Sequence, residues 1–469
     1  MSERLVYALE SFIAAASRHT FSRDLPDYCD LRTIIRLTEE DRIRRPETEA
    51  PYIFSTRDGH YVSVLSVEGA FTEFDEDVDG LEQSLETWVD TLATALNAEF
   101  GRPGHKISMV YERDPAQGQA EIDHLLTPQY QSIRRLGLNI RDVLDEKSRK
   151  LAPWIARERC WLVIWTSRAS LSSAEIRDEQ ARIAAMNKQI PPARFGQIPT
   201  LSSLVSLKIR HDAFLEMLEH TLFNSGRGLM IRLLDAHEAG HDIRAQVDRE
   251  GTSPEWYPLL PDDHITPHGD RKGDDHTPFL APWLNYQLMS EAPETKGNLV
   301  RVGQTWHGSL SMFIGPQQRQ SFTRLLSHIP RGLPFRIRTD IAPGGMRKLG
   351  MTKTALTFLA VLPALRPVWD CVCRLEQADR QDPVTVTTIT TSTWGRSEEE
   401  VNRNLTLLQK AFQSWGVCEM TSQTGDPYRV WTSTILAASA ASGPNLLYPP
   451  LSEVLGMLPL NRAATPWAD

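Results

Sequence analysis

The sequence predicts a mixed α+β fold made of two αβ units, residues 51–250 and residues 297–441. In each unit, strand-like and helix-like segments follow one order: hairpin, helix, strand, helical insert, strand and helix. In both units the last strand joins its helix through a Ser-x-x-Glu capping box, at 172–175 and at 397–400. The shared order indicates a structural duplication, although short αβ units also resemble one another by chance.

Residues 1–50 are predicted to form an N-terminal helix and a charged connector. Glu3 and Glu10 interrupt the apolar sequence, so the helix is not a signal peptide. Its apolar side chains recur on one side and are the candidate interaction residues of the chain: Leu5, Leu9, Phe12 and Ile13. Such a helix either docks on a partner or packs in the core of its own protein.

The first unit begins with a predicted β-hairpin around Asp58-Gly59, a dipeptide that favours a tight turn. Apolar residues at helical spacing predict a helix over 81–96, and alternation predicts a strand over 105–112. Residues 160–166 (CWLVIWT) are typical of a buried strand, and a polar helical insert precedes them. Further helices are predicted at 174–188, 201–223 and 227–249.

Residues 251–296 are rich in proline, aspartate and histidine, which predicts a linker or a long surface loop. In the second unit, a hairpin, helix, strand, helical insert, strand and helix are predicted at 299–313, 317–328, 335–339, 346–376, 384–391 and 398–415. The proline-rich end, residues 442–469, is predicted to be an extended linker.

The composition is that of an ordinary globular protein, with 41% apolar residues, 24% charged residues and a net charge of −9. The negative charge argues against a broad surface for nucleic acid, so no direct nucleic-acid contact is expected. Basic residues between 134 and 150 are expected to form a solvated helix face. Five scattered cysteines predict a reducing compartment, the cytoplasm, and no apolar segment is long enough to span a membrane.

The strongest catalytic look-alike is His237-Glu238-Ala239-Gly240-His241, a literal H-E-x-x-H. On a helix, His237 and His241 could bind one Zn²⁺, and Glu238 could serve as the general base of a metallopeptidase. The sequence lacks the third histidine of the extended motif. Its surroundings form an apolar helical seam: Leu229, Leu233, Ala236, Gly240, Ile243 and Val247. We therefore expect a structural helix, with zinc peptidase activity as the alternative.

Residues 345–352 imitate a phosphate-binding loop but have Met351 where the motif requires lysine. A methionine cannot neutralise phosphate groups, so no nucleotide site is expected there. The aspartates and histidines between Asp262 and His276 have no fixed ligand spacing and are expected to form a solvated loop. The sequence thus predicts no catalytic, cofactor-binding or metal-binding residue in this chain.

Two segments carry a resemblance to a known family. Residues 448–467 (YPPLSEVLGMLPLNRAATPW) resemble the segment before the motor domain in the DotO/IcmB and TraU family of VirB-type ATPases, which serve type IV secretion and conjugation. Ala463 replaces a proline of the usual pattern. Residues 253–262 (SPEWYPLLPD) are similar to the family's W-x-P-x-L-P-G-D, with aspartate where glycine is usual, and Gln287 after that loop also fits.

The resemblance implies a non-catalytic assembly and docking region that is cytoplasmic and peripheral to the bacterial inner membrane. It implies self-association into a dimer or hexamer-based assembly, and contacts with inner-membrane components and other secretion ATPases. The chain has no Walker A or Walker B segment, so the resemblance places ATP and Mg²⁺ in a motor domain beyond residue 469. Besides the zinc peptidase, the alternative is a free-standing adaptor without a motor domain.

Overall fold

The protein was analysed as a computed structural model. The structure describes residues 28–70, 78–100, 103–189, 205–224, 228–261, 263, 281–289, 292–317, 320–359, 366–422, 425–440 and 443–461. The N-terminal helix predicted from the sequence, with Leu5, Leu9, Phe12 and Ile13, lies outside these residues.

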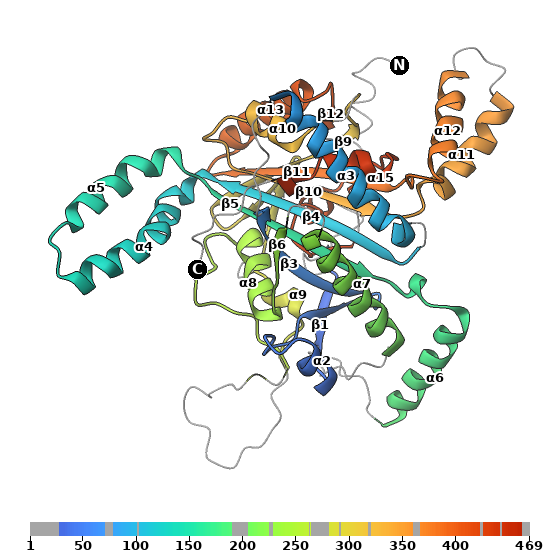
Figure 1. Cartoon of the computed structure of the whole chain (residues 1–469), viewed down its shortest axis with the longest axis horizontal. Helices are drawn as coiled ribbons and strands as arrows, with labels where there is room; N and C mark the ends of the chain where they lie inside the picture. The colour runs from blue at the N-terminus through green and yellow to red at the C-terminus, as the bar shows by residue number, and fades with distance from the viewer. Residues whose placement is uncertain are drawn as a thin grey trace.

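The described residues form a mixed α+β fold around one antiparallel sheet of twelve strands (Figure 1). The strands are β1 (Leu31–Ile35), β2 (Ile53–Thr56), β3 (Tyr61–Ala70), β4 (His105–Asp114), β5 (Arg157–Thr166), β6 (Leu229–Leu233), β7 (Glu294–Lys296), β8 (Leu299–Val302), β9 (Thr305–Ile314), β10 (Phe335–Ala342), β11 (Val386–Gly395) and β12 (Glu419–Thr421). Their order across the sheet is β1-β2-β3-β5-β4-β10-β11-β9-β8-β7, with β6 paired to β3 and β12 paired to β9.

The strand pairing is repeated in the two halves of the chain. In the first half the order is β2-β3-β5-β4, and β6 pairs with β3. In the second half it is β8-β9-β11-β10, and β12 pairs with β9. The two copies meet where β4 and β10 pair antiparallel, from Ile107 opposite Ile341 to Arg113 opposite Phe335. The predicted order of elements is therefore the observed one, and the units share one sheet.

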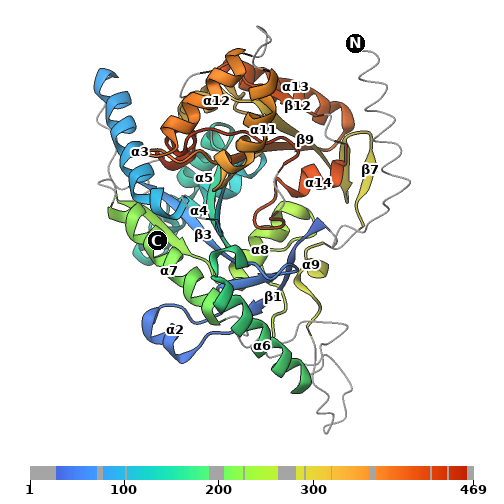
Figure 2. The same cartoon turned by 90° about the vertical axis from the view of Figure 1, so that its right-hand side faces the viewer.

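Helices cover both faces of this sheet. They are α2 (Glu39–Arg44), α3 (Val78–Phe100), α4 (Gly118–Leu136), α5 (Arg141–Leu151), α6 (Ser173–Gln189), α7 (Val205–Asn224), α8 (Ala236–Val247), α9 (Leu284–Gln287), α10 (Phe322–His328), α11 (Gly345–Leu359), α12 (Arg366–Ala378), α13 (Glu398–Ser414), α14 (Pro427–Thr432) and α15 (Leu451–Gly456). α3, α7, α10, α13 and α15 share one apolar core with the sheet, and α8, α9 and α14 share another. α6 packs beside α7 (Figure 2).

The strand sequences match this two-sided burial. In β3, Tyr61 and Leu65 belong to one core while Val62 and Val64 belong to the other, as expected where successive side chains point to opposite faces. In β5 both faces are covered, which explains why residues 160–166 are almost entirely apolar.

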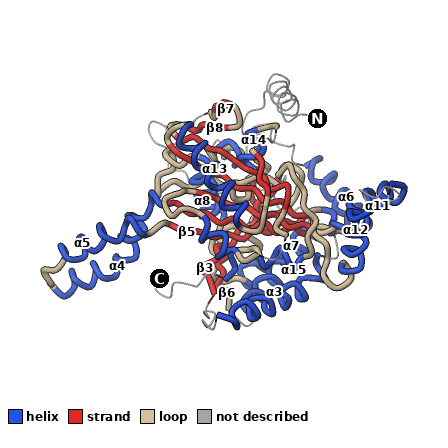
Figure 3. Tube along the Cα trace, turned by 90° about the horizontal axis from the view of Figure 1, so that it is seen from above, coloured by secondary structure: helices blue, strands red, loops and turns tan. Residues whose placement is uncertain are grey.

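A helical hairpin leaves the sheet at the equivalent place in each unit. α4 and α5 connect β4 to β5, and α11 and α12 connect β10 to β11. The two hairpins project from opposite ends of the molecule (Figure 3). We call them the first arm, residues 118–151, and the second arm, residues 345–378. No helix in the described part of the chain is long and apolar enough to cross a membrane.

The structure corrects the predicted helix at 227–249. Residues 229–233 form β6 beside β3, and the helix begins only after Asp235, whose carboxylate accepts from the amides of His237 and Glu238. Leu229 and Leu233 therefore belong to a strand and not to the apolar seam of the helix. A five-residue apolar segment carries no local signal strong enough to distinguish the two, and pairing with β3 decided the outcome.

Two segments expected to be linkers pack closely where they are described. Within residues 251–296, Leu260, Leu284 and Leu288 are buried against the sheet. Within residues 442–469, the part from 443 to 461 pairs with β11 and forms α15, whose Leu451 is fully buried. The described part of the tail is thus folded onto the sheet rather than extended.

Candidate functional site

The two histidines of the H-E-x-x-H motif lie on α8, as predicted, but each has a local partner. His237 Nε2 lies 3.0 Å from the carboxylate of Asp263, and His241 Nε2 donates to the carbonyl oxygen of Ser253 at 3.3 Å. Both partners belong to the segment that follows the helix. The histidines therefore hold this segment against α8.

Glu238 has two structural contacts. Its carboxylate accepts from Arg232 Nη1 at 2.8 Å and from the amide of Asp235 at 3.3 Å, which completes the capping box of α8. Both contacts compete with a role as general base. Among the described residues, no group of three or more His, Cys, Asp or Glu side chains is arranged to hold a metal ion.

The glycine of the motif allows a close approach to the chain that follows. A Cβ atom at Gly240 would lie 2.5 Å from Cγ of Pro258. One turn later, the guanidinium of Arg244 lies over the ring of Trp256 at 4.4 Å. The outer face of α8 is thus shaped to dock residues 253–261.

Residues 253–261 and Gln287, which both belong to the family resemblance, contact each other on this face of α8. The Gln287 side chain accepts from the amide of Leu259 at 2.7 Å and donates to its carbonyl oxygen at 2.9 Å. Arg244 donates to the carbonyl oxygen of Gln287 at 2.5 Å. Segments separated by some thirty residues in the sequence are therefore one structural unit, which we call the α8 platform: α8, residues 253–261 and Gln287.

The phosphate-loop look-alike is not a loop. Residues 345–359 are helical from Gly345 onward, and the amide of Gly345 donates to the carbonyl oxygen of Val384. A Cβ atom at Gly345 would lie 2.5 Å from that oxygen, so the glycine serves close packing against the chain before β11. Lys353 forms an ion pair with Glu376 across the second arm. Of the aspartate and histidine cluster at 262–276, only Asp263 is described.

A chain of buried polar groups in the first unit was not predicted. Ser63 Oγ lies 2.8 Å from His211 Nε2, and His211 Nδ1 lies 2.9 Å from Thr166 Oγ1. The Ser63 hydroxyl donates to the carbonyl oxygen of Tyr52 at 2.9 Å. His105 Nδ1 joins the chain at Thr166, 3.2 Å away.

One arrangement of protons satisfies all these groups. His105 donates to Thr166, Thr166 donates to His211, His211 donates to Ser63, and Ser63 donates to the carbonyl oxygen of Tyr52. Burial lowers the pKa of His105 to about 4 and that of His211 to about 3, so both rings are neutral at pH 7. Because His211 donates to Ser63, and both residues are inaccessible, the pair is a structural contact and not a nucleophile with its base.

Charged side chains lie buried where the two units join. Arg336 and Arg338 on β10 are completely buried. Arg338 donates to Asp340 Oδ1 at 2.9 Å and to the carbonyl oxygens of Ile435 and Ser439. These contacts fix residues 430–440 across the sheet. The sequence did contain a signal for this charged cluster. In residues 335–342 (FRIRTDIA) the charges fall at alternate positions, 336, 338 and 340, which places all three on one face of the strand.

The same network crosses into the first unit. Lys106 on β4 lies 3.3 Å from the carboxylate of Asp340, and burial lowers the pKa of this lysine to about 8. Glu112 accepts a hydrogen bond from Arg336 at 3.2 Å and forms an ion pair with Arg249 at 2.8 Å. Both units therefore contribute charges to each of these two buried groups, which makes their relative placement specific.

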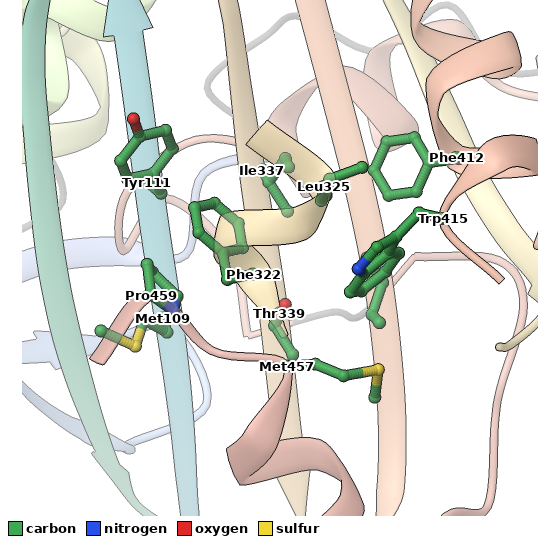
Figure 4. A pocket seen from close by; sticks show the side chains of 11 residues that line it. Met109, Tyr111, Phe322, Leu325, Ile337, Thr339, Phe412, Trp415, Met457 and Pro459 are labelled. Carbon is green, nitrogen blue, oxygen red and sulfur yellow. The ribbon is translucent and has the colours of Figure 1, made fainter. Parts of the chain in front are cut away.

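The C-terminal resemblance segment closes the opposite face of the sheet. Met457 and Pro459 line a small pocket with residues of the sheet, α10 and α13 (Figure 4). Leu451, Val454 and Leu455 are buried, and α15 packs on α3. The segment thus spans from the first unit to the second.

No protein-family model matches the chain, and a search of the curated proteins finds no similar sequence.

Proposed function

We propose that this chain is the cytoplasmic assembly and docking region of a type IV secretion or conjugation ATPase, peripheral to the bacterial inner membrane. Its role would be to self-associate and to attach the motor to inner-membrane components. ATP and Mg²⁺ would bind in the motor domain and not to these residues.

The observation that carries the proposal is the position of residues 443–461. This segment contains residues 448–461 of the stretch that resembles the chain before a motor domain, and it packs against α3 of the first unit and pairs with β11 of the second. A domain attached beyond it would be oriented by the whole sheet. Two further features support the proposal: the resemblance residues form the α8 platform, and the histidine and serine pairs that imitate catalytic groups have structural partners.

The first test is the coding frame beyond codon 469. An uninterrupted frame that reaches G-x-x-x-x-G-K-[ST] supports the proposal, and an immediate stop codon contradicts it in favour of the free-standing adaptor. The second test uses the protein tagged at its native locus and cross-linked in cells. Recovery of inner-membrane secretion proteins is expected, and their absence would remove the docking role.

A further inference from the structure

The end of the first arm exposes apolar side chains that nothing in the described structure covers. Leu136 is 64% exposed, Leu138 48%, Ile140 45% and Val143 58%. All four lie at or beside the turn between α4 and α5, the point of the arm farthest from the sheet (Figure 1). Gly137 adopts a positive φ of 64° there, which closes the hairpin and directs this turn outward. We call residues 136–143 the tip.

The arm does not need these side chains for its own stability. Its two helices are held together nearer the base, where Ile122 and Leu126 are buried. Ser148 is buried as well and donates to Asp123 at 2.6 Å. Tyr130 donates to Asp145 at 2.8 Å. The apolar tip is therefore surplus to the packing of the hairpin, and an exposed apolar cluster of this kind marks an interaction surface.

Positive charge accompanies the tip in an otherwise acidic protein. Residues 129–143 contain three arginines and one aspartate, a net charge of +2 (3 − 1), whereas the whole chain carries −9. Arg134 and Arg135 are exposed and have no ion-pair partner among the described residues. Arg141 has only a distant one, Asp145 at 4.0 Å. Long cationic side chains beside an apolar tip can reach phosphate groups while the tip enters the acyl region.

We propose that the tip of the first arm docks on an anionic phospholipid surface, with Leu136, Leu138, Ile140 and Val143 entering the interface and Arg134 and Arg135 binding headgroup phosphates. A second copy of the chain fits less well. Four side chains on a convex tip offer on the order of a few hundred Å², well below the roughly 800 Å² per partner of a stable protein interface. The cationic tip and the acidic remainder of the chain favour an anionic membrane approached by the arm end first.

The test is flotation of the purified 469-residue chain with vesicles of phosphatidylglycerol and phosphatidylethanolamine, compared with vesicles of phosphatidylcholine alone. The chain is expected to float with the anionic vesicles only. The double variant Leu138→Glu with Ile140→Glu is expected to lower the bound fraction at least tenfold. The double variant Arg134→Gln with Arg135→Gln is expected to lower it severalfold and to weaken the dependence on salt.

The matched control is Ile43→Glu with Val368→Glu, since these apolar residues are 82% and 48% exposed and lie outside the first arm. This control is expected to bind as the unchanged chain does. The proposal is overturned if the unchanged chain does not float with anionic vesicles, if the tip variant floats equally well, or if the tip variant instead changes the molar mass in solution. No secretion protein is present in the assay, so its result is independent of the proposed ATPase function.

Discussion

The two arms occupy equivalent places in the repeated topology but are stabilised differently. In the second arm, Leu349 and Val372 form a small apolar core with Val384, and Trp369 packs against it. In the first arm, Ile122 and Leu126 are buried near the base beside a hydrogen-bonded group around Ser148, and further apolar side chains lie at the exposed tip. The repeat thus preserved the path of the backbone, while the described parts of the two arms are held together by different contacts.

If the two units that bear the arms unfold together as one cooperative domain, removal of Arg338 should destabilise both. Arg338→Met removes one of the two cations beside Asp340 and leaves two buried carbonyl oxygens without this donor, and a loss of about 3–5 kcal/mol in the free energy of unfolding is expected. β5 and β11 should lose hydrogen-exchange protection together. Arg374→Met, on an exposed face of α12, is the control. Protection that persists in β5 while β11 opens would show that the units fold separately.

A negative charge should destabilise the second arm strongly when placed at Val372 and leave the first arm nearly unchanged when placed at Val143. Val372 is 5% exposed, so Val372→Asp is expected to cost about 2–4 kcal/mol and to open α11 and α12 to hydrogen exchange. Val143 is 58% exposed, so Val143→Asp should change stability by less than about 0.5 kcal/mol. Equal losses in the two variants would contradict the difference between the arms.

Acid should destabilise the first unit through its buried histidines. Burial lowers the pKa of His105 to about 4, below the ordinary value of 6.5. The unfolded chain therefore binds more protons below pH 6.5, and stability that is complete above this pH is lost as the pH falls toward 4. A loss of about 2–3 kcal/mol is expected from this residue alone. Urea unfolding from pH 8 to pH 4 measures it, and the same slope in a His105→Gln variant would refute the assignment.

Loss of the polar contact in the first arm should have a smaller, local effect. Ser148→Ala removes one of the two side-chain donors to the carboxylate of Asp123, the other being Gln119 at 3.0 Å, at an expected cost of about 1 kcal/mol. Faster exchange in α4 and α5, with no change in α11 and α12, is the predicted signature. Thr127→Ala, which removes an exposed hydroxyl from α4, is the control and should be nearly neutral.

The smallest effect is expected on α8, whose counterpart in the second unit is α14. Both helices follow a short strand and begin at a capping aspartate, Asp235 or Asp426. Because His237 contacts Asp263 in the segment after α8, His237→Ala should loosen residues 253–261 without altering metal content, as measured by mass spectrometry of the purified protein. Stoichiometric zinc that is lost in this variant would overturn the structural interpretation and restore the peptidase alternative.

Local signals in the sequence predicted the elements that depend on neighbours along the chain. Asp58-Gly59 lies in the turn between β2 and β3, and Ser172 and Glu175 exchange the two hydrogen bonds of a capping box. At the second predicted box, the backbone amide of Glu400 donates to the hydroxyl of Ser397. The Glu400 carboxylate, however, accepts from the backbone amide of Arg396 and not from that of Ser397. The Ser-x-x-Glu pattern does not specify which of two neighbouring backbone amides, that of Arg396 or that of Ser397, the glutamate carboxylate accepts from.

The features missed from the sequence depend on contacts between distant residues. Residues 229–233 form a strand because they pair with β3. The serine–histidine chain forms because α7 places His211 within hydrogen-bond distance of Ser63 on β3 and Thr166 on β5. The guanidinium of Arg338 can be buried because Ile435 and Ser439, about a hundred positions away, supply carbonyl oxygens to it. Such pairings leave no periodic trace near either partner.

The folded tail also makes the molecule a mechanical connection. Leu447 and Thr387 exchange both backbone hydrogen bonds, at 2.8 and 2.9 Å, and Thr385 donates to the carbonyl oxygen of Pro449. A pull on residue 461 must first extract the buried side chains of α15 from beneath α3 before it loads these bonds in β11. Beyond β11 the load passes through β10 to β4, and so into the first unit. Tension applied at residue 461 is therefore distributed over the whole sheet, and it reaches the strands to which both arms are attached.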